Sequence, residues 1–205
     1  MRKQDGRFNE RLGKNLLING CKRVNQRGFD GTSFVDGEYC WDRWKATATA
    51  MVQIVEEGFY TPDTVHTLSW EGGTPQQVTS PASGHWTIPE VPRDATNIQL
   101  EKGSAATEFE RRPLSAEELL CYRYYYKLMV RESNYGAAGS SYFYDRNLPV
   151  HMRIKPTLNW VLLGSGNLTV LNGSPTNTYT IRLGAQVTAT GDWFGEMEYY
   201  LDAEL

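Results

Sequence analysis

The stretch that decides the fold lies at residues 195–205 and reads Gly195-Glu196-Met197-Glu198-Tyr199-Tyr200-Leu201-Asp202-Ala203-Glu204-Leu205. From Met197 onward, every second side chain is apolar or aromatic, and the residues between are mostly acidic. Successive side chains of a β-strand point to opposite faces, so this alternation predicts a strand with one buried and one exposed face. A strand of this kind needs paired neighbours, so we expect antiparallel β-structure around it.

Further strands are predicted upstream of this one. In the second half of the chain we expect them at 150–154, 157–163, 167–171 and 178–189; in the first half, apolar or alternating segments lie at 15–20, 47–55, 65–70, 84–91 and 95–101. Turn signals recur about every ten residues, which is the spacing of a β-sandwich. Residues 131–149 are rich in Gly, Ser, Asn and Tyr, and we interpret them as a loop of the composition that binding loops use.

One segment carries a clear helix start. In Ser115-Ala116-Glu117-Glu118, Ser115 has the character of an N-cap, and Glu118 completes a capping box three residues later. The two carboxylates fall in the first turn, where the helix dipole favours negative charge. The tyrosine-rich run 122–126 suits a strand better than a helix. The sequence therefore predicts a helix of about two turns that gives way to a strand and joins two β modules.

Composition excludes several classes of protein. The chain has 205 residues, of which 40% are hydrophobic and 22% charged, as in ordinary globular proteins. No apolar run approaches the roughly 18 residues of a membrane span, and no secretory signal precedes residue 15. The three cysteines cannot all pair, and their spacing matches no zinc motif. We expect free, mostly buried thiols in a protein made in the cytosol.

Positive charge is concentrated at the N-terminus. Residues 1–27 hold eight basic and two acidic side chains, although the whole chain has a net charge of -3. A basic arm can bind nucleic acid or dock on an acidic protein surface. Only Phe8 interleaves the basic residues, and no nucleic-acid-binding motif follows, so docking or simple solvation is favoured. The predicted attachment residues are Arg2, Lys3, Arg7, Arg11 and Lys14.

The sequence carries no catalytic signature. It lacks a GxSxG elbow and a P-loop, and Gly164-Ser165-Gly166 reads as a hairpin turn. The three histidines stand far from one another and from the cysteines, which gives no metal-ligand spacing. We therefore expect a protein without catalysis, metal or cofactor.

Glycan binding is the chemistry for which the sequence offers candidates. Sugar C–H groups need flat aromatic faces, and sugar hydroxyls need carboxylate, amide or guanidinium partners. The chain has six tryptophans; Trp44, Trp70 and Trp86 are interpreted as core residues, whereas a second set stands in polar or turn-like surroundings. In the alternative interpretation, these aromatic side chains pack between subunits. The candidate glycan-binding residues are Tyr142, Tyr144, Asp145, Arg146, Trp193 (expected at a turn tip) and Trp41.

Several motifs in order carry a family resemblance. They are residues 15–20 (Asn-Leu-Leu-Ile-Asn-Gly), 26–28, 42–44, 67–70, 98–101, 106–113 and 117–125, followed by 150–153 and 202–205. This series resembles the C-terminal receptor-binding modules of tailed-phage tail fibres and tailspikes, which have a carbohydrate-binding-like jelly roll. The resemblance implies a jelly-roll β-sandwich, a homotrimer and recognition of a host cell-surface polysaccharide. Cys21 stands where such modules often carry an acidic or amide residue, which weakens a calcium site on that pattern.

The resemblance also implies a domain plan and a location. We expect a basic attachment arm at 1–14, a jelly roll at 15–113, a helix with a connecting strand at 114–130, and an antiparallel β module at 131–205. The arm would bind structural proteins of the virion, on the tail or capsid surface, with no nucleic acid and no membrane insertion. Two alternatives stay open: a structural virion protein, such as a head fibre, decoration or tail adaptor, and a depolymerase.

Overall fold

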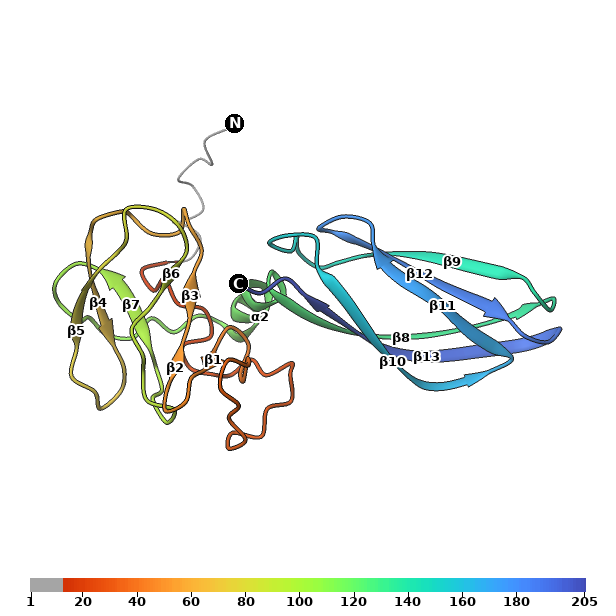
Figure 1. Cartoon of the computed structure of the whole chain (residues 1–205), viewed down its shortest axis with the longest axis horizontal. Coiled ribbons are helices and arrows are strands. Elements are labelled where there is room, and N and C mark those ends of the chain that lie inside the picture. Colours follow the sequence, from red (N-terminus) through yellow and green to blue (C-terminus); the bar gives the residue numbers. More distant parts are fainter. Residues whose placement is uncertain (1–12) are drawn as a thin grey trace. The chain divides into compact units, whose positions relative to one another are not determined.

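The computed structural model describes residues 13–205, apart from the side chains of residues 170–172, and the chain divides into two compact units (Figure 1). The first unit runs to Cys121 and includes Leu205; the second is Tyr122–Glu204. The predicted fold class is confirmed: the chain is mainly β, its strands pair antiparallel, and a short helix precedes a second β module. No helix among the described residues is long and apolar enough to cross a membrane.

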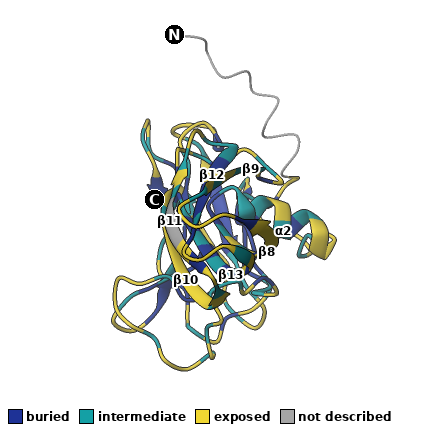
Figure 2. Cartoon of the chain, turned by 90° about the vertical axis from the view of Figure 1, so that its right-hand side faces the viewer, coloured by how far each residue is buried: buried dark blue, intermediate teal, exposed yellow. Residues whose placement is uncertain are grey.

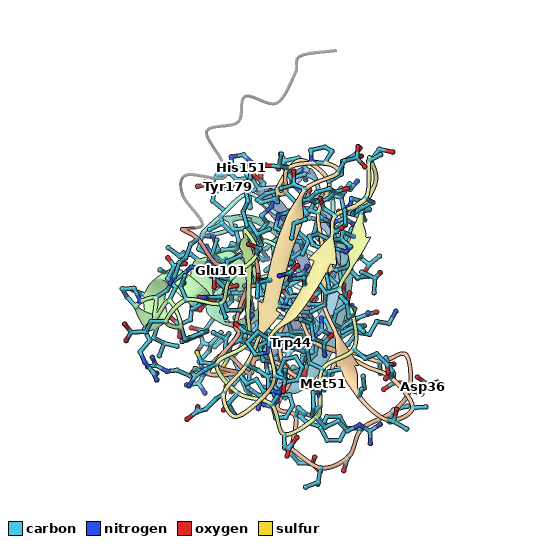
Figure 3. The ribbon with its side chains drawn as sticks, turned by 90° about the vertical axis from the view of Figure 1, so that its left-hand side faces the viewer. Asp36, Trp44, Met51, Glu101, His151 and Tyr179 are labelled. Carbon is cyan, nitrogen blue, oxygen red and sulfur yellow. The ribbon has the colours of Figure 1, made fainter. Side chains whose placement is uncertain are left out.

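Residues 15–113, for which a jelly roll is expected, contain three small antiparallel sheets. The core of this unit joins residues from most of the strands with others from the intervening loops, and Trp44 and Trp86 belong to it as predicted. Figure 3 labels Trp44 and Met51, both fully buried. The three sheets pair β1 (Lys45–Ala46) with β2 (Met51–Val52), β3 (Ile54–Val55) with β6 (Trp86–Thr87), and β4 (Val65–Ser69) with both β5 (Gln76–Thr79) and β7 (Gln99–Lys102).

The prediction of a strand at 15–20 is wrong. Buried amide side chains, rather than a neighbouring strand, supply many of the hydrogen bonds to the backbone there. Asn15 Oδ1 accepts hydrogen bonds from the backbone N–H groups of Leu17 and Leu100, both at 3.0 Å. Gln53 bonds both backbone groups of Ile18, each at 2.8 Å. Since buried backbone groups need partners, these amides hold an irregular segment inside the unit.

The helix α2 (Leu114–Tyr122) begins earlier than predicted. Its first i→i+4 bond runs from Glu117 N–H to the Pro113 carbonyl at 3.2 Å, so Pro113 occupies the cap position. Ser115 is then the second helical residue, and its assignment as N-cap is wrong. The change to a strand is confirmed, because β8 begins at Tyr125.

The second unit is a β-sandwich of two three-stranded antiparallel sheets, ordered β10-β13-β8 and β11-β12-β9 (Figure 1). One hydrophobic cluster joins Met197, Tyr199 and Leu201 of β13 to Ile181 and Leu183 of β12. The alternating apolar residues predicted from Met197 onward thus form part of the core of this unit. The strands are β8 (Tyr125–Gly136), β9 (Ser141–Asn147), β10 (Thr157–Gly166), β11 (Leu168–Pro175), β12 (Thr180–Val187) and β13 (Gly191–Asp202).

Two predictions for the second unit are wrong. Residues 150–154 form no strand. The expected loop 131–149 instead contains the end of β8, a turn at 137–140 and all of β9. β9 pairs with β12 from Ser141 to Asn147, and its tyrosines alternate with polar residues, as strand formers do on a half-buried sheet.

We expect His66, on β4, to make the stability of the first unit depend on pH. The ring is buried, lies edge-on to Trp86 at 5.1 Å, and its Nδ1 is 2.8 Å from the Thr64 carbonyl. Burial lowers the pKa of His66 below its usual 6.5. As the pH falls below 6.5, His66 of the unfolded chain becomes protonated, whereas the buried ring of the folded chain stays neutral. The free energy of unfolding therefore falls. Urea unfolding at pH 7.5 and 5.5 should show a smaller difference for His66→Phe than for the wild type; an equal difference would contradict this.

Candidate functional site

The tyrosines predicted to bind sugar lie on the inner face of the second sandwich. Tyr142 and Tyr144 are half-buried and pack against the cluster of Leu168, Ala185, Val187 and Trp193. The Tyr142 hydroxyl donates to the Tyr135 carbonyl at 3.2 Å, and burial raises the pKa of Tyr144. Their packing favours a structural role over an exposed stacking platform.

Trp193 does not stand at a turn tip. It lies within β13, is 2% exposed, and its ring centroid is 5.5 Å from that of Tyr142. A Cβ at Gly195 would lie 2.5 Å from Leu168 Cδ2, so glycine there permits the close packing of this end of the sandwich. Because its ring is covered, Trp193 offers no face to a sugar.

The polar partners predicted beside these rings are already engaged. Asp145 accepts two hydrogen bonds from Arg182, at 2.8 and 2.9 Å, and these bonds lower the pKa of Asp145. Arg146 forms an ion pair with Glu132, which lies on β8 in the facing sheet. Both side chains therefore serve contacts within the unit.

Trp41 belongs to an aromatic group in the first unit. Phe29 and Phe34 meet it edge-on at 4.7 and 5.8 Å, and Lys22 Nζ lies 4.5 Å from its ring centroid. Burial lowers the pKa of Lys22 to about 8. One face of the indole is thus covered by a partly desolvated ammonium.

Of the predicted attachment residues, only Lys14 lies within the described part of the chain. Its Nζ donates to Thr107 Oγ1 and to the Glu108 carbonyl, so it anchors to the loop after β7. Arg2, Lys3, Arg7 and Arg11 lie outside the described residues.

The candidate site that the structure offers is a hollow of about 280 Å³ in the first unit, called here the Trp70 pocket. It lies where β4 ends and β7 begins, since Ser69 pairs with Gln99 in the sheet. Two half-buried aromatic rings and several polar groups line it together. Its lining residues are Ser69, Trp70, Glu71, Pro75, Asn97, Ala106, Thr107 and Phe109.

A glycine turn positions the Trp70 ring. Gly73 N–H bonds the Trp70 carbonyl at 3.1 Å, and Gly72 has φ +74°, a backbone conformation that suits glycine. A Cβ on Gly73 would lie 2.1 Å from Trp70 Nε1, so the indole rests directly against the glycine backbone. The same ring is partly buried against the core of the unit. Its position is therefore fixed before any ligand arrives.

A second turn fixes the polar wall of the pocket. Glu71 Oε2 accepts hydrogen bonds from Asn97 Nδ2 at 2.6 Å and Thr96 Oγ1 at 3.2 Å, while Glu71 N–H donates to the Thr96 carbonyl at 3.0 Å. Asn97 has φ +51°, which asparagine tolerates better than most residues. Carboxylate and amide are thus held beside the aromatic rings.

A neighbouring hollow of about 270 Å³ is lined by more ionisable side chains than the Trp70 pocket. It is lined by Gly13, Lys14, Leu16, Phe59, Tyr60, Thr61, His66, Glu101 and Lys102. Burial alone would raise the pKa of Glu101, but hydrogen bonds from Thr107 and Gln99 outweigh burial and lower it. These bonds, at 2.7 to 2.8 Å, occupy both carboxylate oxygens. Glu101 is labelled in Figure 3.

The Trp70 pocket was missed by the sequence interpretation, which placed Trp70 in the core. In the predicted segment 65–70, Trp70 is the last residue, and Glu71-Gly72-Gly73 follows it. An aromatic side chain at a strand end, followed by an acidic residue and two glycines, was the available signal. Its chemistry suits a ligand with both apolar faces and hydroxyl groups.

The comparisons with known proteins give only a weak structural likeness. Two solved structures of discoidin II from Dictyostelium discoideum, one recombinant and one wild-type, are similar to this chain at 7% identity and a TM-score of 0.31. The similarity covers 94% of this chain and 94% and 92% of those chains. No family model and no curated protein matches the sequence.

Proposed function

We propose that this chain is a non-catalytic glycan-binding protein and that the Trp70 pocket holds the sugar. The observation that carries the proposal is the meeting of two aromatic rings, Trp70 and Phe109, with Glu71 and Asn97 in one hollow. The rings offer faces for sugar C–H groups, and the carboxylate and amide offer hydrogen bonds to hydroxyls. Because these groups are held in place beforehand, little ordering cost opposes binding.

The pocket retains free hydrogen-bonding capacity. Within residues 13–205, the Trp70 indole N–H has no hydrogen-bond partner, and Glu71 uses only Oε2 in the side-chain bonds described above. A sugar hydroxyl could accept from the indole N–H and donate to Glu71 Oε1. Because the pocket residues keep their positions through bonds within the unit, binding would order few additional side chains.

We extend the proposal to the biological setting that the resemblance implies. The chain would be a tail-fibre or receptor-binding protein that attaches a phage particle to host surface polysaccharide, as a homotrimer, located on the virion. The competing function is a structural virion protein, which the exposed apolar strand β10 favours. A particle component of that kind would assemble normally and bind no saccharide.

The experiment is a screen of immobilised bacterial surface polysaccharides, followed by titration of any that bind. We expect saturable binding that Glu71→Gln with Asn97→Ala removes and that Tyr142→Phe leaves unchanged. If Tyr142→Ala with Tyr144→Ala removes binding while Trp70→Ala does not, the site lies in the second unit. Absence of binding to every saccharide, with normal incorporation into particles, would favour the structural function and contradict the proposal.

The attachment role of the N-terminal arm is tested separately. Deletion of residues 1–12 leaves Lys14 and its bonds in place, so we expect a folded chain with unchanged saccharide binding that fails to join virion proteins. Co-purification with particles, compared with the full chain, measures this. Incorporation at the wild-type level would show that the arm has another role.

A further inference from the structure

Strand β10 is an exposed apolar edge. It lies at one side of the sheet β10-β13-β8, and four successive apolar side chains on it remain accessible. Trp160 is 37% exposed, Val161 48%, Leu162 41% and Leu163 51%. Figure 2 shows the strand largely in the colour of exposed residues. An edge strand also leaves a row of backbone N–H and C=O groups unpaired.

The strand lacks the charges and the proline that normally protect an edge. Proteins usually place charges, proline or a bulge that bends the strand away on an exposed edge. β10 contains no charged residue and no proline, and the sequence has no Asp, Glu, Lys or Arg from Thr157 to Ile181. The strand does have a register shift between Leu162 and Gly164, but the four apolar side chains at 160–163 remain exposed. The edge strand β11 of the second sheet falls in the same uncharged stretch.

The opposite side of the sandwich carries charged side chains on both edge strands, and its exposed apolar residues, Met129, Tyr135 and Phe143, stand singly rather than in a run. The edge strand β8 carries Lys127, Arg131 and Glu132, and the edge strand β9 carries Asp145 and Arg146. Each of these charges takes part in an ion pair within the unit. The contrast between the two sides indicates that the β10 side is shaped for contact with protein.

We propose that the β10 edge is the surface through which copies of this chain contact one another. The inference rests on the homotrimer of the proposed function, and not on glycan binding. In a symmetric assembly, residues near the axis meet their own counterparts, so a charged edge would face like charge while a neutral apolar edge gains from burial. With ten residues, the strand extends about 33 Å at the usual rise, which suits a contact of standard size.

The tyrosine-rich run 122–126 does not require a neighbouring subunit to cover its rings. Instead, Tyr124 and Tyr125 are buried within the chain, and Tyr122 and Tyr126 are half-buried against each other at 4.8 Å. Among the described residues, the longest run of consecutive exposed apolar side chains is Trp160–Leu163 of β10.

The test is the molar mass of the full chain by light scattering, for the wild type and for Val161→Lys with Leu163→Lys. The introduced charges should be tolerated in the isolated chain, because the side chains at positions 161 and 163 are exposed. Position 161 also lies opposite the acidic Glu198. The control is Phe143→Lys, which places one lysine at an apolar site on the edge strand β9 that is even more exposed than positions 161 and 163. Thermal unfolding confirms that each variant is folded.

We expect a mass of three chains for the wild type and the control, and a mass of one chain for the double variant. A wild-type monomer at micromolar concentration, or a double variant that keeps the wild-type mass, would overturn the inference. A folded monomeric variant that still binds a small oligosaccharide supports both proposals. If the double variant loses association and the wild type binds no saccharide, the result supports this interface and contradicts the proposed function.

Discussion

Replacing Glu117 by alanine is expected to destabilise the first unit by about 3 kcal/mol or more, because it strips the partner from a buried charge. Glu117 Oε1 lies 3.1 Å from Arg112 Nη1, and the two side chains are only 6% and 8% exposed. Glu117 Oε2 also accepts the backbone N–H of Asn19 at 2.7 Å. The substitution would leave the Arg112 guanidinium buried with one carboxylate fewer, and an Asn19 N–H without its acceptor.

The consequence reaches beyond the helix. Arg112 also donates to the carbonyls of Leu17 and Asn15, so the pair ties α2 to the irregular segment that replaces the predicted strand at 15–20. Urea unfolding measures the loss. Ser115→Ala is the matched control, since Ser115 is an exposed residue of the same helix and is not its cap; it should change the free energy of unfolding by less than about 0.5 kcal/mol. Similar effects of the two substitutions would refute the role of the buried pair.

Trp70→Ala is expected to weaken glycan binding at least about 30-fold, because removing an aromatic anchor from a binding pocket typically costs 2 kcal/mol or more. The unit should remain folded, since the Trp70 side chain is only partly buried at the margin of the core. Tyr135→Ala is the control: its ring is also aromatic and 63% exposed, but it lies in the second unit. Isothermal titration with the saccharide found in the screen measures both.

Gly73→Ala tests whether the affinity for the glycan depends on where the Trp70 indole lies, and not only on its being present. The added Cβ would overlap the indole at 2.1 Å, so the ring must leave its place while the pocket keeps its tryptophan. We expect a loss of affinity close to that of Trp70→Ala. If Gly73→Ala binds like the wild type, preorganisation of the ring does not contribute to affinity.

Periodicity predicted the strands that bury one face. The alternation from Met197 to Leu201 fixes one side of β13 toward the core, and that prediction holds because the local pattern and the packing agree. The strand predicted at 15–20 is wrong because the local pattern and the backbone hydrogen bonds disagree there. Their apolar residues do enter the core, but Asn15 and Gln53 supply the backbone partners, and hydrophobicity carries no signal of such long-range bonds.

The candidate site was harder to predict than the fold. Tyr142 and Tyr144 stand among Gly, Ser and Asn, which reads as a loop, yet pairing with β12 makes them part of a sheet. The Asp192-Trp193-Phe194 run beside Gly191 looked like a turn, although β13 already begins there. Trp70 and Phe109 are 39 residues apart in sequence, and only the pairing of β4 with β7 explains how they come to line one hollow.

The central claim is that a glycan contacts the first unit at Trp70, and the indole N–H resonances of the six tryptophans test it most directly. During titration with the bound oligosaccharide, we predict a saturable shift of the Trp70 signal, assigned with Trp70→Phe. The signals of Trp160 and Trp193, which lie in the second unit, should stay in place. Saturable shifts at Trp193 or Trp41 with an unmoved Trp70 signal would contradict the account.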